Sequence, residues 1–129
     1  MRATPHTSCG LIALRFTQPS SWCNSTVTAV NFSVAAGLDQ TAGDVANVVN
    51  FENLDATAMT TALTVTGSLL ANTILTGSGN DTIRGGGGGD VIDAGAGNDS
   101  VDFWGTEVSI DGGTGSNTLV LRATADIDL

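Results

Sequence analysis

The sequence predicts an all-β solenoid, a fold in which short strands stack in regular coils along one axis. Two observations lead to this prediction. Glycine and aspartate recur together from Thr76 to Asp102, with Asp81, Asp90 and Asp99 nine residues apart. The same nine-residue interval keeps one large apolar residue in a constant position. A repeat of this kind indicates that each unit adds one turn and one strand to a stack.

The repeat runs without a gap through five units, from Thr76 to Val120. The units are TGSGNDTIR, GGGGGDVID, AGAGNDSVD, FWGTEVSID and GGTGSNTLV. Position eight is apolar in all five, and its occupants are Ile83, Ile92, Val101, Ile110 and Leu119. Because side chains alternate along a strand, the last three positions of a unit predict a short strand with one core residue. The six positions before them predict a turn, in which glycine permits a positive φ.

Weaker copies precede these units. Residues 67–75 keep Asn72 at position six and Ile74 at position eight, and residues 58–66 keep only Val65. We interpret both as coils that have kept the core residue and lost the turn chemistry.

The pattern resembles the RTX family, the hemolysin-type calcium-binding repeats of consensus GGxGxDxUx, where U is a large apolar residue. The resemblance implies a right-handed parallel β-roll or β-helix in which two units complete one coil. Each unit would then stack on the unit two further along. The implied rungs are Ile83, Val101 and Leu119 in one sheet and Ile74, Ile92 and Ile110 in the facing sheet.

The resemblance also implies a ligand, Ca2+, and the residues that hold it. Stacked carboxylates repel each other until a cation enters, and Ca2+ takes about six to eight oxygen ligands. The pair Asp81 and Asp99 would make one complete site. Its co-ligands would be the backbone oxygens of Gly77, Gly79, Gly95 and Gly97.

Two further sites implied by the resemblance lack one carboxylate each. Asp90 would share an ion with Asn72, and Asp99 would share one with Asn117, whose amide oxygens carry no charge. The pairing of Asp90 with Val108 should hold no ion. One aliphatic residue per strand makes a thin core, and at about 25 cal/mol per Å² its burial barely offsets the ordering of so many glycines. We therefore expect the module to fold only with Ca2+.

Composition narrows the classes of partner. The formal net charge is −9, from 13 acidic residues against four arginines and no lysine. This charge disfavours nucleic acid and anionic membranes as partners and favours cations, although simple solubility explains it equally well. No apolar run reaches the roughly 20 residues of a membrane span, and we expect no cleaved signal peptide.

The sequence contains few residues or motifs that could act in catalysis. His6 is the only histidine, and both GxSxG and a P-loop lysine are absent. The repeat phase explains the carboxylate pairs Asp90 with Asp93 and Asp99 with Asp102, because it makes Asp93 and Asp102 outward strand residues. We predict that this chain is not itself an enzyme, although it could be part of a larger one.

The fourth unit departs from the pattern, with Phe103 and Trp104 at turn-glycine positions and Val108 in place of aspartate. A hydrophobic cap on the roll is one interpretation. A recognition patch for a protein or glycan is the other.

The expected organisation has four parts. Residues 1–25 form an atypical segment, for which disorder is one interpretation, and it contains Cys9 and Cys23, either bonded or free. Residues 26–66 form a degenerate β and cap region, with a strand within 26–34 and a short helix beginning at Thr41. The calcium-binding roll spans 67–120, and a tail spans 121–129.

By the resemblance, the expected protein is bacterial, secreted and extracellular, and it leaves the cell through type I secretion machinery. The tail is short for a complete secretion signal and favours a fragment. The alternatives are a C-terminal piece of a larger secreted enzyme or toxin, and a structural module of an adhesin or matrix.

Overall fold

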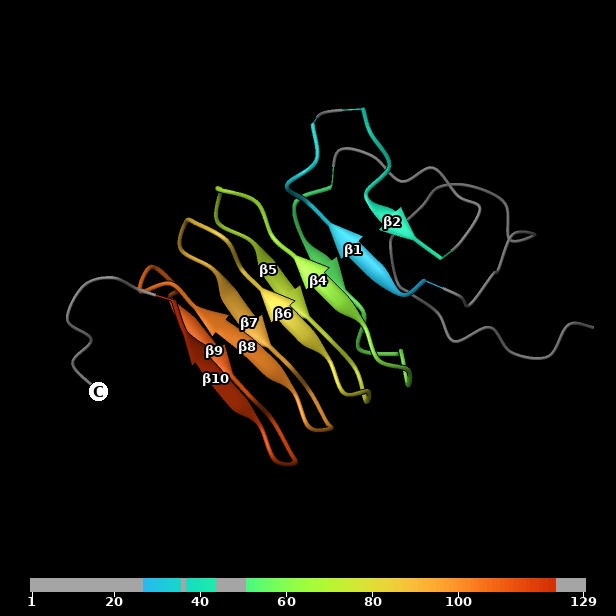
Figure 1. Cartoon of the computed structure of the whole chain (residues 1–129), viewed down its shortest axis with the longest axis vertical. Helices are drawn as coiled ribbons and strands as arrows, with labels where there is room; N and C mark the ends of the chain where they lie inside the picture. The colour runs from blue at the N-terminus through green and yellow to red at the C-terminus, as the bar shows by residue number, and fades with distance from the viewer. Residues whose placement is uncertain (1–26, 36, 44–50, 123–129) are drawn as a thin grey trace, which may run out of the picture.

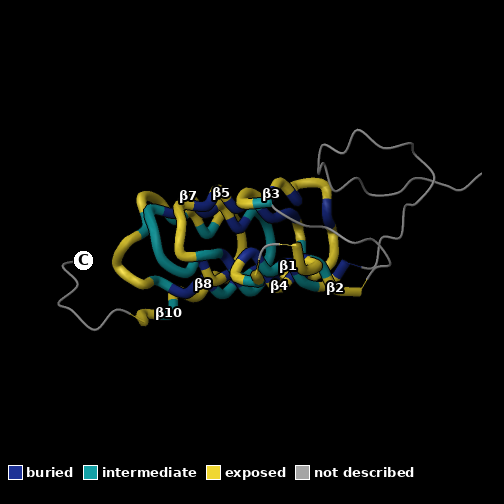
Figure 2. Tube along the Cα trace, turned by 90° about the horizontal axis from the view of Figure 1, so that it is seen from above, coloured by how far each residue is buried: buried dark blue, intermediate teal, exposed yellow. Residues whose placement is uncertain are grey.

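The described part of the chain is a two-layered parallel β-solenoid. The computed structural model describes residues 27–35, 37–43 and 51–122, and within these ranges it contains ten strands and no helix. Figure 1 shows the strands stacked side by side along the solenoid, and Figure 2 shows the two layers from above. The described residues include no helix long and apolar enough to cross a membrane. The predicted all-β parallel solenoid is confirmed.

Two sheets make up the layers. Sheet A has the strand order β10-β8-β6-β4-β1-β2, and sheet B has the order β3-β5-β7-β9. The strands of sheet A are β1 (Ala29–Asn31), β2 (Thr41–Ala42), β4 (Thr64–Thr66), β6 (Thr82–Arg84), β8 (Ser100–Phe103) and β10 (Thr118–Leu121). Those of sheet B are β3 (Leu54–Asp55), β5 (Thr73–Leu75), β7 (Val91–Asp93) and β9 (Ser109–Asp111). From β3 onwards the chain alternates between the sheets, so two nine-residue units complete each coil.

The register of the strands agrees with the repeat phase. Neighbouring strands are parallel except β1 and β2, which are antiparallel. The position-eight residues pair as predicted, in the rungs Val65, Ile83, Val101 and Leu119 of sheet A and Ile74, Ile92 and Ile110 of sheet B. The position-eight side chains thus form two facing columns between the sheets.

The core is one residue wide on each side, and its residues become less buried toward the last coil. Ile74, Ile83 and Ile92 are fully buried, whereas Ile110 only packs against the core from its edge and Leu119 is 47% exposed. Since β9 and β10 are the last strands of their sheets, these two rungs are covered from one side only. The position-eight pattern alone did not indicate this loss of burial.

The first coil is covered by the region before it. The strand predicted within residues 26–34 is present as β1, which pairs with β4, and Val30 and Phe32 are buried. The helix predicted to begin at Thr41 is wrong at its start, because Thr41 and Ala42 form β2. Pairing with β1 decides this conformation, since the Thr28 N–H donates to the Ala42 carbonyl at 2.9 Å. The rest of that predicted helix lies outside the described residues, as do residues 1–25, with Cys9 and Cys23, and residues 123–129.

Candidate metal centre

The turns between the strands stack into two columns. The first turn column contains residues 76–81, 94–99 and 112–117, each leading into a strand of sheet A. The second turn column contains residues 67–72, 85–90 and 103–108, each leading into a strand of sheet B. Stacking follows from the parallel register, because a turn takes the same place in each coil. Both columns contain predicted ligand residues.

In the first turn column, each position-six side chain bonds to the backbone of the coil before it. The Oδ1 atom of Asp81 accepts a hydrogen bond from the Leu63 N–H at 2.8 Å. The Oδ1 atom of Asp99 accepts one from the Asp81 N–H at 2.8 Å, and that of Asn117 accepts one from the Asp99 N–H at 3.0 Å. The structure therefore places Asp81 and Asp99 in adjacent turns, with one oxygen of each joining two coils.

The other carboxylate oxygen has no partner. Asp81, Asp90 and Asp99 are at most 2% exposed, and the Oδ2 atom of each is buried without a hydrogen bond. Burying a charged oxygen without a donor or cation is costly. Three such oxygens, held in place by their Oδ1 partners, fit a hard cation, which accepts carboxylate ligands directly. The residues present thus suit Ca2+.

Burial raises the pKa of two of these groups above the usual value of 3.8. For Asp81, burial is the largest cause; the hydrogen bond from the Leu63 N–H and the nearby Thr76 side chain oppose it, and the charge of Asp99 adds to it. For Asp90, burial again comes first. The hydrogen bond from the Asn72 N–H lowers its pKa, and the charge of Glu107 raises it. Protons and a metal cation should therefore compete for these carboxylates.

Acidic side chains alone would not complete a coordination shell. Among the residues the structure describes, no three His, Cys, Asp or Glu side chains gather at one point. An ion between Asp81 and Asp99 would then complete its shell with backbone carbonyls, neutral side-chain oxygens or water. Backbone carbonyl oxygens are ordinary ligands of Ca2+.

The carbonyls of Gly77 and Gly95 point toward the following coil. The Gly77 oxygen accepts a hydrogen bond from the Ala96 N–H at 2.8 Å, and the Gly95 oxygen accepts one from the Thr114 N–H at 2.9 Å. A carbonyl oxygen has two lone pairs, so these bonds leave one acceptor direction on each. The two predicted ligands therefore lie between coils, where an ion would bridge them.

The carbonyls of Gly79 and Gly97 are covered by the next glycine of the column. A Cβ atom on Gly97 would overlap the Gly79 oxygen, and one on Gly115 would overlap the Gly97 oxygen. Gly97 and Gly115 also have φ values of 137° and 123°, in the region that favours glycine. The glycines of this column thus allow the turns to approach so closely that oxygens of two coils can share one ion.

The second turn column offers fewer oxygens to an ion. The Oδ1 atom of Asp90 accepts a hydrogen bond from the Asn72 N–H at 2.9 Å. The Asn72 side chain is occupied elsewhere, since its Oδ1 accepts from the Ser68 N–H at 2.7 Å and its Nδ2 donates to the Glu52 carbonyl at 2.6 Å. In the coil that follows Asp90, the exposed Val108 side chain has no ligating atom. Asp90 thus has one orphaned oxygen and poorer neighbours than the Asp81 and Asp99 pair.

Beside the aspartates, a second row of side-chain hydrogen bonds joins successive coils, and the sequence analysis did not predict it. The Oδ1 atom of Asn80 accepts a hydrogen bond from the Asn98 N–H, and that of Asn98 accepts one from the Ser116 N–H, both at 2.9 Å. These side chains bond forward along the solenoid, whereas the aspartates bond backward. The available signal was asparagine at position five of two units that stack.

The turn of the fourth unit is closed by another missed residue, Glu107. Its carboxylate accepts hydrogen bonds from the N–H groups of Trp104, Gly105 and Thr106 at 2.9, 3.0 and 3.0 Å. An acidic side chain thus organises a turn that lacks the position-six aspartate.

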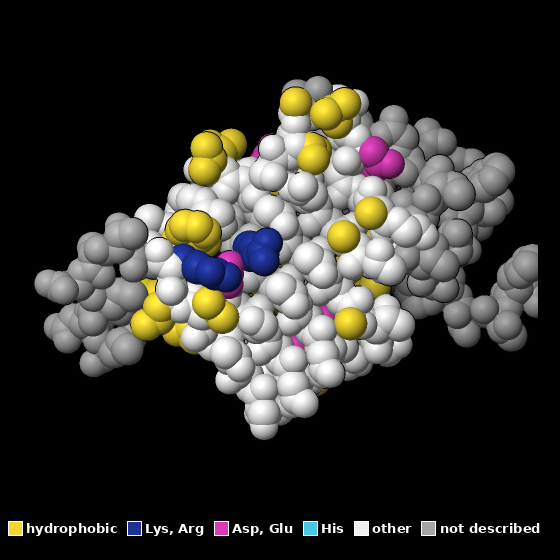
Figure 3. Space-filling model, in the orientation of Figure 1, with side chains coloured by type: hydrophobic (Ala, Val, Ile, Leu, Met, Phe, Trp, Pro, Cys, Tyr) yellow, Lys and Arg dark blue, Asp and Glu magenta, His cyan; other side chains and the backbone are white. Residues whose placement is uncertain are grey.

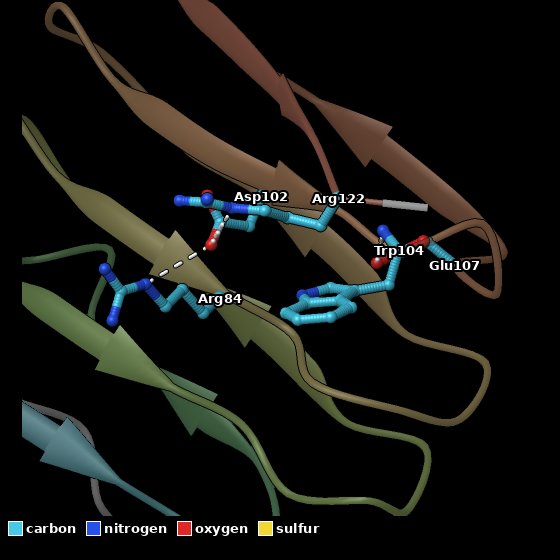
Figure 4. A network of polar contacts seen from close by, with 5 residues as sticks. All are labelled: Arg84, Asp102, Trp104, Glu107 and Arg122. Atoms are coloured by element: carbon cyan, nitrogen blue, oxygen red, sulfur yellow. Dashed lines mark hydrogen bonds and ion pairs between the residues drawn. The ribbon is translucent and has the colours of Figure 1, made fainter. Parts of the chain in front are cut away.

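Asp102 lies on the outer side of its strand, as the repeat phase indicates, but it is buried. The Nε atoms of Arg84 and Arg122 lie 3.3 and 3.2 Å from its Oδ2, and their side chains cover it (Figure 4). The predicted outward position is therefore correct, but the repeat phase did not indicate that two arginines bury the side chain. Both described arginines are paired here and not with the turn aspartates.

Together, the fold and this site define a class of protein: a parallel β-roll whose stacked turns present buried carboxylates to a cation. Comparison with protein families agrees with this class. The model of the RTX calcium-binding nonapeptide repeat matches residues 66–101 in four copies. This segment therefore belongs to the RTX calcium-binding repeats, and the resemblance seen in the sequence is confirmed. No curated protein and no solved structure matches the chain.

Proposed function

We propose that the module binds Ca2+ in the first turn column, between the coils that carry Asp81 and Asp99. The Oδ2 atoms of both aspartates and the backbone oxygens of the predicted glycines would hold the ion. The observation that carries this proposal is the stacked pair of buried Oδ2 atoms without a partner. A bound cation supplies the positive charge that these oxygens lack.

Two weaker sites accompany it. Asp99 with Asn117 and Asp90 with Asn72 each provide one charge instead of two. Affinity for Ca2+ depends on the number of charged ligands and on the rigidity of the site. These pairs should therefore bind Ca2+ only after the principal site is filled.

Calcium binding is coupled to folding in this proposal. Without the ion, the buried carboxylates oppose a core that is one residue wide on each side. An ion that binds only the folded state adds RT ln(1 + [L]/Kd) to the free energy of unfolding. A Kd of about 10⁻⁴–10⁻³ M, the range of extracellular calcium modules, would leave the roll unfolded in a cytoplasm and folded outside.

The biological setting follows from the family. RTX repeats are typical of extracellular bacterial proteins, and we propose that this module is secreted through type I machinery and folds on release. The module itself would be a calcium-dependent structural element without catalysis. The alternative is that the module is part of a larger secreted enzyme or toxin, or of an adhesin.

The test combines a calcium titration followed by circular dichroism with calorimetry of the same samples. The wild type should gain strand signal and release heat on binding Ca2+. Asp81→Ala and Asp99→Ala should lose the tightest site, whereas Asp111→Asn, which keeps an acceptor for the Gly113 N–H on an exposed strand residue, should behave as the wild type. Equal strand signal in chelator and in calcium would overturn the coupling to folding.

A further inference from the structure

The two outer faces of the solenoid differ in charge. On sheet B, the outer face carries Asp93 and Asp111 in adjacent strands, without an intervening cation. On sheet A, Arg84, Asp102 and Val120 occupy the corresponding row. The only arginines in the described residues, Arg84 and Arg122, lie on this face, with one acidic side chain between them (Figure 3). In a chain of net charge −9, the cluster of Arg84, Asp102 and Arg122 carries one net positive charge.

The two guanidinium groups are held in place but remain open to solvent. Each lies against the Oδ2 atom of Asp102 through its Nε, at 3.3 and 3.2 Å. The arginine side chains are 53% and 46% exposed, whereas that of Asp102 is 8% exposed. In Figure 4 the terminal nitrogens of Arg84 point away from Asp102. One carboxylate neutralises one of the two charges, so a positive charge with oriented donors faces outward.

An exposed indole ring borders these arginines. Trp104 is 45% exposed, and it follows Phe103, whose carbonyl accepts a hydrogen bond from the Arg122 N–H at 2.7 Å. Trp104 comes directly after β8, the strand that carries Asp102. Figure 4 shows the indole pointing from its turn toward the strand of Arg84. Glu107 fixes that turn through three backbone N–H groups, so the ring is presented on a closed loop.

A row of hydroxyl groups runs along the same face. Thr64, Thr82, Ser100 and Thr118 pair in register across β4, β6, β8 and β10. They occupy position seven, which the alternation of the strand places on the outer side with position nine. Sheet A thus presents hydroxyl groups, two guanidinium groups and one flat aromatic ring together.

We propose that this surface, made of Arg84, Arg122 and Trp104, binds an acidic saccharide, a sugar ring that carries a carboxylate. The guanidinium groups recognise the carboxylate through paired hydrogen bonds. The indole provides a flat apolar surface for the C–H face of the ring. Threonine and serine hydroxyls suit the hydroxyl groups of neighbouring sugar units. A free inorganic anion would leave the ring of Trp104 unused.

This inference goes beyond the calcium site and uses none of its ligands. The test is calorimetric titration of the calcium-saturated protein with trigalacturonate, with neutral galactotriose and sulfated galactotriose as comparisons. Free Ca2+ is kept in excess over saccharide carboxylates in all samples. The wild type should bind trigalacturonate and not the neutral trisaccharide. Arg84→Gln and Arg122→Gln should each weaken binding about tenfold, the loss expected for a charged hydrogen bond. Trp104→Ala should weaken it several-fold.

Two controls separate recognition from folding. Asp111→Asn, on the opposite sheet, should leave saccharide binding unchanged, and the calcium titration of every variant should match the wild type. If Arg84→Gln changes the calcium titration, Arg84→Lys is used in its place. Lysine keeps the positive charge beside Asp102 but lacks the planar guanidinium group that forms paired hydrogen bonds with a carboxylate. Binding that is equal for acidic and neutral sugars, or that survives both arginine substitutions, overturns the proposal. Equal or tighter binding of the sulfated sugar overturns the assignment of a carboxylate.

Discussion

Asp99→Asn should change stability in opposite directions with and without calcium. The asparagine keeps an oxygen that can accept the hydrogen bond from the Asp81 N–H, now 2.8 Å long. It removes the charge on the buried Oδ2, which has no partner. The chain already contains this arrangement, because Asn117 accepts from the Asp99 N–H and donates its Nδ2 to the Gly112 carbonyl. The substitution is therefore compatible with the turn.

The magnitudes follow from these contacts. In chelator, removing an uncompensated buried charge should raise the free energy of unfolding by about 1–3 kcal/mol, the cost of an unsatisfied buried polar group. In calcium at about 1,000 times Kd, one lost site removes about 4.1 kcal/mol of stabilisation. The two effects add, so the variant should there be about 1–3 kcal/mol less stable than the wild type. The order of stability of the two proteins should thus invert between the two conditions.

The assay is circular dichroism: the strand signal of each protein in chelator reports the fraction of folded molecules, and urea unfolding is followed in excess calcium. Asp111→Asn is the matched control, since Asp111 also accepts one backbone hydrogen bond, from the Gly113 N–H at 2.8 Å, but is exposed. It should give the same small change in both conditions. A loss of stability for Asp99→Asn that is equal with and without calcium would refute the reasoning.

Three other predictions concern pH, turns and core. Because burial raises the pKa of Asp81 and Asp90 above 3.8, the folded state binds protons more tightly than the unfolded state. In chelator the fraction of folded molecules, read from the strand signal, should therefore rise as pH falls from neutral toward the raised pKa values, and calcium affinity should fall over the same range; a strand signal that does not depend on pH contradicts this. Gly97→Ala should prevent close stacking and abolish calcium-induced strand signal, whereas Gly37→Ala, at a positive φ in open space, should cost only about 1 kcal/mol by urea unfolding. Ile92→Ala should lower the free energy of unfolding in calcium by about 2–5 kcal/mol, and a change below 1 kcal/mol would show that the central rung is not packed as described.

Much of the solenoid could be read from the sequence because its determinants are local and periodic. Alternation along each short strand predicted Ile83 and Ile92 as core residues. The resemblance to the RTX repeats, in which two units complete one coil, implied which strands pair and that Asp81 and Asp99 lie in stacked turns. The period extends these inferences to every coil, since every unit repeats the same environment.

The features that escaped prediction depend on partners from other coils. Asp102 has the spacing of a solvated strand residue, yet Arg84 from the strand before it and Arg122 from the strand after it bury it. Thr41 and Ala42 have the local pattern of a helix start, yet the antiparallel partner β1 makes them a strand.

The sequence by itself determined the period and the core position of each unit, because these follow from strand alternation that is identical in every unit. The rungs and the columns of acidic turns came from the resemblance to the RTX repeats, because a period alone does not say how many units complete one coil. Only the tertiary structure decided which oxygen of each aspartate joins the coils and which is left for a cation. That division depends on the N–H group of a residue 18 positions earlier, and such a contact exists only once the coils have stacked.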